Sequence, residues 1–260
     1  MPSDEPEEHK KIVTFWHGGA LPRLHHECIR SWKSFDYEVT LYFYEMVSNI
    51  PKGVALVDAR TVLRLSKAKP LRNWAAVADI IRLILVQEPE NVWIDTDLCL
   101  IKPIPSAECI LLGHQWKNKV CNAIISLPGN ARIPHEILEH FYAGNLGPWA
   151  HMKPKLKHFF SKISKTPYGF DRLPNSHWGS HALEYYIKRH KLHDYLLPQK
   201  AFYSNETYTG QLFEKNDFAH LIDDQEVFGL HFFNKNYNFE LPEKGSFYEW
   251  LIANNEFASF

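Results

Sequence analysis

A long amphipathic helix followed directly by a short buried strand constrains the fold more than any other stretch of this sequence. The spacing predicts a helix over Pro70–Gln87, with a proline in its first turn. Its apolar side chains recur three and four residues apart, as they do on one buried helix face. The next apolar run, Asn91–Ile94, is typical of a buried strand. A helix that leads straight into a buried strand indicates an α/β fold.

Two carboxylates follow this strand in the sequence Asp95-Thr96-Asp97. Their spacing places both side chains in one loop at the carboxyl end of the strand, where ligands bind in open α/β sheets. Carboxylate oxygens suit Mg²⁺ or Mn²⁺. The tripeptide alone is a weak signal, because a solvated turn carries the same residues by chance. Asp79 and Arg82 strengthen it, since they lie three residues apart on the preceding helix and can act together.

The rest of the chain also mixes strands and helices and contains no linker rich in glycine or serine. Residues 1–11 form an acidic segment that we expect to be a flexible tail, and residues 12–260 are expected to form a single α/β domain. The further strands predicted from apolar runs are Ile12–Trp16, Tyr37–Tyr44, Val54–Asp58, Leu98–Ile101, Ile110–Gly113, Val120–Leu127, Leu196–Tyr203 and Val227–Phe233. The further helices predicted are Leu24–Ser34, Pro134–Tyr142 and Gly179–Lys191.

Charge and composition exclude several classes of protein. The net charge of −1 is far from that of a general nucleic-acid binder, so we expect no nucleic-acid partner. The strongest apolar stretch, Ile80–Val86, is too short to span a bilayer, and no secretory signal opens the chain. The four cysteines are irregularly spaced, which suits a reducing compartment. A cytoplasmic location is therefore expected.

The segment 151–172 is basic. Aromatic and aliphatic residues interleave with six cationic residues and one acidic residue: Lys153, Lys155, Lys157, Lys162, Lys165 and Arg172 against Asp171. This pattern is compatible with a solvated helix, and also with peripheral contact to the anionic inner face of a membrane, where lipid-linked acceptors would lie.

Several short blocks together resemble the DXD-motif glycosyltransferases of GT-A fold, specifically the DXD-sugar group. That group includes the yeast initiating mannosyltransferase, the α-1,4-galactosyltransferase-like enzymes and bacterial capsular polysaccharide transferases. The blocks that carry the resemblance are Ile12–Gly19, Ser31-Trp32, Ala78–Asp97, Cys121-Asn122-Ala123, Trp178-Gly179-Ser180, Leu196–Tyr203 and Gly229-Leu230-His231. The usual Gly-Gly before the DXD strand is replaced by Pro89-Glu90-Asn91, and the usual Gly-Pro by Gly179-Ser180. The resemblance implies a Rossmann-like mixed sheet that binds a nucleotide-diphospho-sugar.

The resemblance also implies roles for individual residues. Asp95, Asp97 and Arg82 would be catalytic, and Asp95, Asp97 and His231 would hold the metal, Mn²⁺ or Mg²⁺. Arg82 would in addition hold Asp95 in place. The nucleotide-sugar would be bound by residues from three blocks: Phe15, Trp16, His17, Gly18, Asp79, Arg82, Trp93, Asp95 and Asn122. Of these, Phe15 and Trp16 would stack on the base, and Asn122 would contact a sugar hydroxyl.

The expected activity is a metal-dependent, retaining transfer of a hexose from a UDP- or GDP-sugar to a hydroxyl of a carbohydrate or lipid-linked acceptor. Two alternatives remain open. A phosphatase of the haloacid dehalogenase type would use Asp95 and Asp97, with Asp223-Asp224 as its later acidic pair. A non-catalytic carbohydrate-binding module would use the aromatic residues, which make up 14% of the chain.

Overall fold

A mixed six-stranded sheet forms the centre of the part of the chain that the structure describes. The computed structural model describes residues 11–65, 73–105, 110–116, 119–127, 131–152, 154–155, 158, 173–233 and 242–257. The strand order is β3-β2-β1-β4-β7-β6. The strands are β1 (Lys11–Trp16), β2 (Glu38–Phe43), β3 (Val54–Asp58), β4 (Asn91–Ile94), β6 (Leu111–Trp116) and β7 (Lys119–Ser126). Strands β1 to β4 run parallel, and β7 pairs antiparallel with β4 and with β6.

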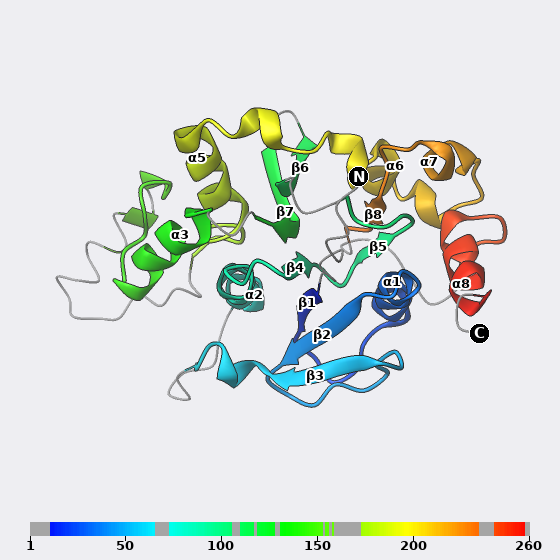
Figure 1. Cartoon of the computed structure of the whole chain (residues 1–260), viewed down its shortest axis with the longest axis horizontal. Helices are drawn as coiled ribbons and strands as arrows, with labels where there is room; N and C mark the ends of the chain where they lie inside the picture. The colour runs from blue at the N-terminus through cyan, green and yellow to red at the C-terminus, as the bar shows by residue number, and fades with distance from the viewer. Residues whose placement is uncertain are drawn as a thin grey trace, which may run out of the picture.

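The helices that follow β1 and β3 cover opposite faces of this sheet (Figure 1). Helix α1 (Arg23–Lys33) packs its Ile29 and Trp32 in the cluster that contains Ile12 of β1. Helix α2 (Trp74–Leu85) packs in the cluster that contains Val13, the next residue of β1. Because successive side chains of a strand point to opposite faces, β1 is buried on both. Helices α3 (Ile133–Tyr142) and α5 (Ser180–His190) lie on the α2 face.

Helix α2 begins with a side-chain cap. The Asn73 side chain accepts a hydrogen bond from the Ala76 backbone N–H at 3.2 Å, which satisfies one of the exposed donors of the first turn. The apolar stripe predicted from the sequence is buried against the sheet, and the helix ends at Leu85. The predicted start at Pro70 lies outside the described residues, which resume at Asn73.

A second, two-stranded sheet extends the molecule beyond α1. Strand β5 (Leu98–Leu100) pairs antiparallel with β8 (Gly229–His231), and Leu98 is the partner of His231. Apolar side chains from this small sheet pack with α7 (Ala219–Asp223) and α8 (Phe247–Phe257) in a third cluster, next to α1 (Figure 1). Because Leu98 opposes His231, the chain just before β5 lies beside the end of β8.

Most predicted elements are confirmed with small shifts of their ends, but the predicted strand Leu196–Tyr203 is wrong. A 3₁₀ turn, η4 (Gln199–Ala201), occupies its centre, and the Tyr203 N–H donates to the Gln199 carbonyl at 2.8 Å. Pro198 has no N–H for a strand ladder and precedes this turn, so the apolar run cannot continue as a strand. The remaining short elements are η1 (Ala59–Thr61), η3 (His193–Tyr195), α6 (Asn205–Thr209) and η5 (Gln211–Phe213).

Two expectations lie largely or wholly outside the described residues. The predicted flexible tail is one, because residues 1–10 are not described. The basic segment 151–172 is the other, because only residues 151–152, 154–155 and 158 of it are described. Among the described residues, the helices are all too short or too polar to cross a membrane.

Candidate functional site

The order of the parallel strands indicates a candidate ligand site at the carboxyl ends of β1 and β4. These two strands are neighbours, and the chain leaves β1 for α1 on one face but enters β4 from α2 on the other. Open α/β sheets bind ligands where the strand order reverses in this way, in the crevice outside the carboxyl ends. The loops that begin at His17 and Asp95 leave the sheet at this point.

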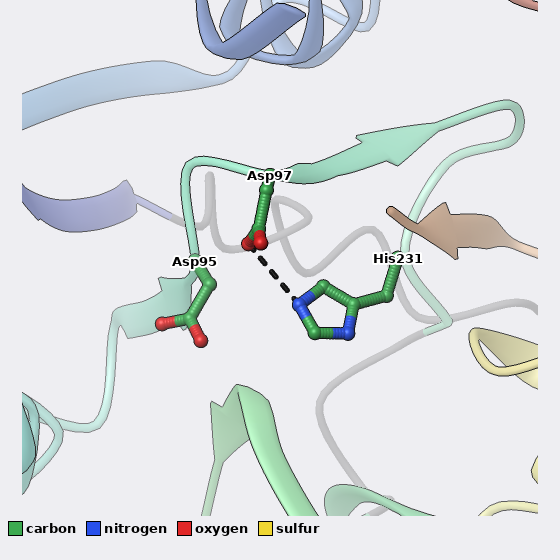
Figure 2. Close-up of side chains that lie close together, drawn as sticks. All are labelled: Asp95, Asp97 and His231. Atoms are coloured by element: carbon green, nitrogen blue, oxygen red, sulfur yellow. Dashed lines mark hydrogen bonds and ion pairs between the residues drawn. The ribbon is translucent and has the colours of Figure 1, made fainter. Parts of the chain in front are cut away.

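Asp95, Asp97 and His231 come together at this edge (Figure 2). One potential ligand atom from each side chain lies within 4.8 Å of the other two. Asp95 follows the last residue of β4, Asp97 precedes β5, and His231 ends β8. The Nε2 atom of His231 lies 3.1 Å from Oδ1 of Asp97. The sequence prediction that these three residues meet is therefore confirmed, although 134 residues separate Asp97 from His231.

Burial and mutual charge set the ionisation of this cluster. Burial alone would lower the pKa of His231, but the Asp97 carboxylate outweighs it, so the pKa of His231 is raised. Burial opposes the ionisation of Asp97 too, and the attraction of His231 nevertheless holds the pKa of Asp97 well below its usual range. Burial raises the pKa of Asp95 against the opposing effect of Arg82. His231 and Asp97 thus form an ion pair that a bound cation would replace.

Arg82 links helix α2 to the loop after β4. Its side chain is only 6% exposed, and it donates to Oδ1 of Asp95 at 2.9 Å and to the Asn122 carbonyl of β7 at 2.6 Å. Its guanidinium lies 4.9 Å from the ring centroid of Trp93, whose Nε1 donates to the same Asp95 oxygen at 2.7 Å. The predicted role of Arg82 in holding Asp95 is confirmed, and Trp93 holds the same carboxylate.

Asp79 is buried behind this arrangement. Its Oδ1 atom lies 3.6 Å from Arg82 and accepts from the Asn122 side chain at 2.9 Å. Asn122 in turn accepts from the Ser180 hydroxyl at 3.2 Å, in the first turn of α5. Side chains from α2, β7 and α5 thereby form one polar network behind Asp95.

Gly179 is the place where this network leaves no room for a side chain. A Cβ at Gly179 would lie 2.2 Å from Nδ2 of Asn122 and 2.5 Å from Oδ1 of Asp79. We expect Gly179→Ala to lower the free energy of unfolding by about 2 kcal/mol, because overpacked interiors must shift their neighbours. Chemical denaturation measures this change. Gly19→Ala is the matched control, since a Cβ there meets nothing within 4 Å, and an equal loss in both variants would contradict the prediction.

The buried carboxyl of Asp79 should make stability depend on pH. Desolvation raises its pKa to about 6 despite the attraction of Arg82. The folded protein therefore binds this proton more tightly than the unfolded chain, so stability falls as pH rises from about 4 to about 6. Asp79→Asn removes the unfavourable free energy of the buried charge. The variant should therefore be more stable than the wild type at pH 8, by about 2–3 kcal/mol, and equal to it at pH 4.

Denaturant titrations at the two pH values measure the effect of Asp79→Asn. Asp58→Asn is the control, because hydrogen bonding to the Arg60 N–H lowers the pKa of the exposed Asp58 carboxyl. That variant should show no gain at pH 8. A wild type that remains as stable as Asp79→Asn at pH 8 would contradict the assignment of a destabilising buried charge.

Sequence reasoning missed the contact between His25 and Thr96. His25 lies in the first turn of α1, is 3% exposed, and places Nδ1 2.8 Å from the Thr96 hydroxyl, between the two aspartates. The ring of Trp16 packs against His25 with centroids 4.7 Å apart. A polar residue on the buried face of an amphipathic helix is the signal that could have marked it.

The aromatic residues at the end of β1 are mostly packed within the protein. Phe15 is 7% exposed and lies against Tyr44 and Trp74, with ring centroids 5.8 and 6.3 Å away. The ring of His17 stacks on the ring of Trp74, with centroids 3.5 Å apart. Gly18 has a φ of 141°, a conformation that L side chains rarely adopt. Their predicted contacts with a nucleotide stay predictions.

The donor set fits a divalent cation. Two carboxylates that are 25% and 18% exposed (Asp95 and Asp97) lie beside a histidine that is 8% exposed, and its Nε2 atom faces Asp97. Around an octahedral Mg²⁺ ion, ligand atoms on opposite sides lie about 4.2 Å apart. The ligand atoms of Asp95, Asp97 and His231, which lie within 4.8 Å of one another, therefore need to move only slightly closer to bind one ion. One imidazole beside two carboxylates offers mixed nitrogen and oxygen ligands to such an ion.

The acidic pair that the phosphatase alternative would use, Asp223-Asp224, lies at the end of α7. Asp224 follows α7, and its carboxylate forms an ion pair with Lys200 at 2.9 Å.

Comparison with known proteins identifies no family for this chain. No protein-family model matches the chain, and no curated protein matches it. The chain is a mixed α/β protein in which Asp95, Asp97 and His231 form a potential metal site at the edge of the sheet.

Proposed function

We propose that this protein is a metal-dependent glycosyltransferase that moves a hexose from a nucleotide-diphospho-sugar to a hydroxyl of a glycan or glycolipid. The observation that carries the proposal is the Asp95–Asp97–His231 cluster beside Arg82, at the point where the strand order reverses. A diphosphate leaving group is stabilised by positive charge near its leaving oxygen. The point where the strand order reverses is also where open α/β sheets bind nucleotides.

The residues around the cluster would hold the donor in one orientation. A divalent cation bound there would neutralise the negative charge that the diphosphate gains as the glycosidic bond breaks. Arg82 and Trp93 fix Asp95 through the same oxygen, Oδ1, and His231 fixes Asp97. Because these partners are buried, the two carboxylates are already oriented before a ligand arrives, which reduces the cost of reorganisation.

The finer features of the proposal follow from the resemblance described above. They are a GT-A arrangement of the sheet, a UDP- or GDP-linked hexose as donor, Mn²⁺ as the preferred ion and retention of configuration at the anomeric carbon. A reducing, cytoplasmic compartment is supported by the free, buried thiols of Cys28, Cys99 and Cys121. Contact of the segment 151–172 with a membrane stays a prediction.

A donor panel tests the proposal. The purified chain is incubated with each of several UDP- and GDP-hexoses, with Mn²⁺ or with a chelator, and release of the nucleoside diphosphate is measured. We expect one donor to be hydrolysed slowly without an acceptor, and only when Mn²⁺ is present. Cleavage of p-nitrophenyl phosphate with phosphorylation of Asp95 would instead support the phosphatase. Sugar binding that is unchanged by the chelator, without any hydrolysis, would support the binding module.

A further inference from the structure

A basic pocket of about 400 Å³ lies apart from the Asp95–Asp97–His231 cluster. Its walls are the outer side of α1 (His26, Arg30, Lys33 and the following Ser34), the turn 51–53 and Asn255 of α8. This volume lies within the range of small-molecule sites. No carboxylate is among the lining residues, although the whole chain has slightly more acidic than basic residues.

The pocket lies toward the opposite edge of the sheet from the candidate metal site. The turn 51–53 leads directly into β3, and Ser34 follows the end of α1 shortly before β2, so this is the edge where the parallel strands begin. On α1 itself, Lys33 lies eight residues from His25, which contacts the Asp95–Asp97 loop. Eight helical residues span about 12 Å. A ligand of the pocket is therefore separate from a ligand of the metal cluster.

The positive charge of Lys33 is held in place without being neutralised. Its ammonium donates to the Tyr37 carbonyl at 3.0 Å, which leaves two further N–H donors. Within the described ranges, no carboxylate oxygen lies within 4 Å of the ammonium of Lys33 or of Lys52. Arg30 differs, because it pairs with Glu27 at 3.2 Å as well as with the Asn255 carbonyl at 2.8 Å.

Lys33 lies against the turn at Gly53. Its φ of 80° is one that glycine adopts readily, and a Cβ there would lie 3.5 Å from Cε and 3.8 Å from Nζ of Lys33. Lys33 thus lies along the backbone next to Lys52, and both residues line the pocket. Two unneutralised cations with spare donors match the charge and the acceptor oxygens of a phosphate dianion.

We propose that this pocket binds the phosphate group of a phosphate monoester. The remaining volume accommodates the organic part of the ligand, and Ser34 and Asn255 line the same space. The ester is either a small soluble metabolite or the headgroup of a lipid, because both present the same dianion.

Calorimetric titration of the full chain with glycerol 3-phosphate at low ionic strength tests the proposal. We expect saturable binding of one molecule per chain. Lys33→Gln and Lys52→Gln should each raise the Kd by about ten-fold, the effect of losing one charge-assisted hydrogen bond. Lys52→Arg should stay close to the wild type. The exposed Lys244 provides the matched control, and Lys244→Gln should leave the Kd unchanged. Asp97→Asn should also leave it unchanged, because the metal cluster is a separate site.

Vesicles of phosphatidylcholine, with and without phosphatidic acid, identify the source of the phosphate. Retention on phosphatidic acid vesicles that is lost in both Gln variants and not displaced by glycerol 3-phosphate indicates a lipid, whereas displacement by the soluble ester indicates a metabolite. The proposal is overturned if neither probe binds, or if binding is the same in Lys33→Gln, Lys52→Gln and the wild type. It is also overturned if Lys244→Gln weakens binding as much as they do.

Discussion

Under the proposed function, replacing Asp97 by Asn should reduce the rate of sugar transfer by about 1,000-fold, since charge stabilisation at a leaving group contributes effects of this size. The amide has the shape of the carboxylate but lacks its charge, so it is a poorer ligand for a divalent ion. It also leaves His231 without the ion-pair partner that lies 3.1 Å away. The rate of nucleoside diphosphate release at saturating Mn²⁺ measures the effect.

The control for Asp97→Asn is Asp223→Asn, which changes an exposed aspartate at the end of α7. It should keep the wild-type rate. Circular dichroism melting curves establish that both variants are folded. An Asp97→Asn variant that is folded and retains more than about a tenth of the rate would contradict a direct role in metal binding.

Replacing Arg82 by Lys should lower the rate by about 10–100-fold, as is typical when a residue that orients a metal ligand is lost. Lysine keeps the positive charge but presents a single ammonium group, which cannot span Oδ1 of Asp95 and the Asn122 carbonyl as the guanidinium does. It also gives up the planar contact with Trp93. Since buried carboxylates then lose a partner, the free energy of unfolding should fall by about 2 kcal/mol.

Mn²⁺ titrations, transfer rates and denaturation curves together test the Arg82→Lys prediction. Arg60→Lys is the matched control, because Arg60 makes a comparable two-bond contact with Asp58 but its side chain is 53% exposed. Exposed pairs contribute little, so Arg60→Lys should change neither rate nor stability. If Arg82→Lys behaved like Arg60→Lys, Arg82 would not position Asp95 in the working site.

The central part of the fold could be predicted because its signals are local. The apolar stripe of α2 and the buried run Asn91–Ile94 each fit one periodicity, and both elements are confirmed. The run Leu196–Tyr203 also contains several apolar residues, yet its backbone forms η4, because Pro198 and the bond from Tyr203 to Gln199 favour a turn. The short helices α6 and α7 have five residues each, too few for a helical period to appear.

Only part of the candidate site could be predicted from local sequence patterns. Asp95 and Asp97 follow from the strand they terminate, and Arg82 from its spacing to Asp79. The approach of His231 depends on the pairing of β5 with β8, which no local pattern specifies, and it was expected only from a resemblance. The contact of His25 with Thr96 was missed because it joins residues 71 positions apart and neither lies in a recognisable motif.

Mn²⁺ titration followed by electron paramagnetic resonance tests most directly whether the acidic loop and β8 together form a metal site. The account predicts one tightly bound Mn²⁺ per chain, with a spectroscopic coupling to a nitrogen nucleus because His231 supplies an imidazole ligand. In His231→Gln that nitrogen coupling should disappear, and in Asp97→Asn the tight site should be lost. A chain that binds no Mn²⁺ tightly, or binds it with a nitrogen coupling unaffected by His231→Gln, would contradict the account.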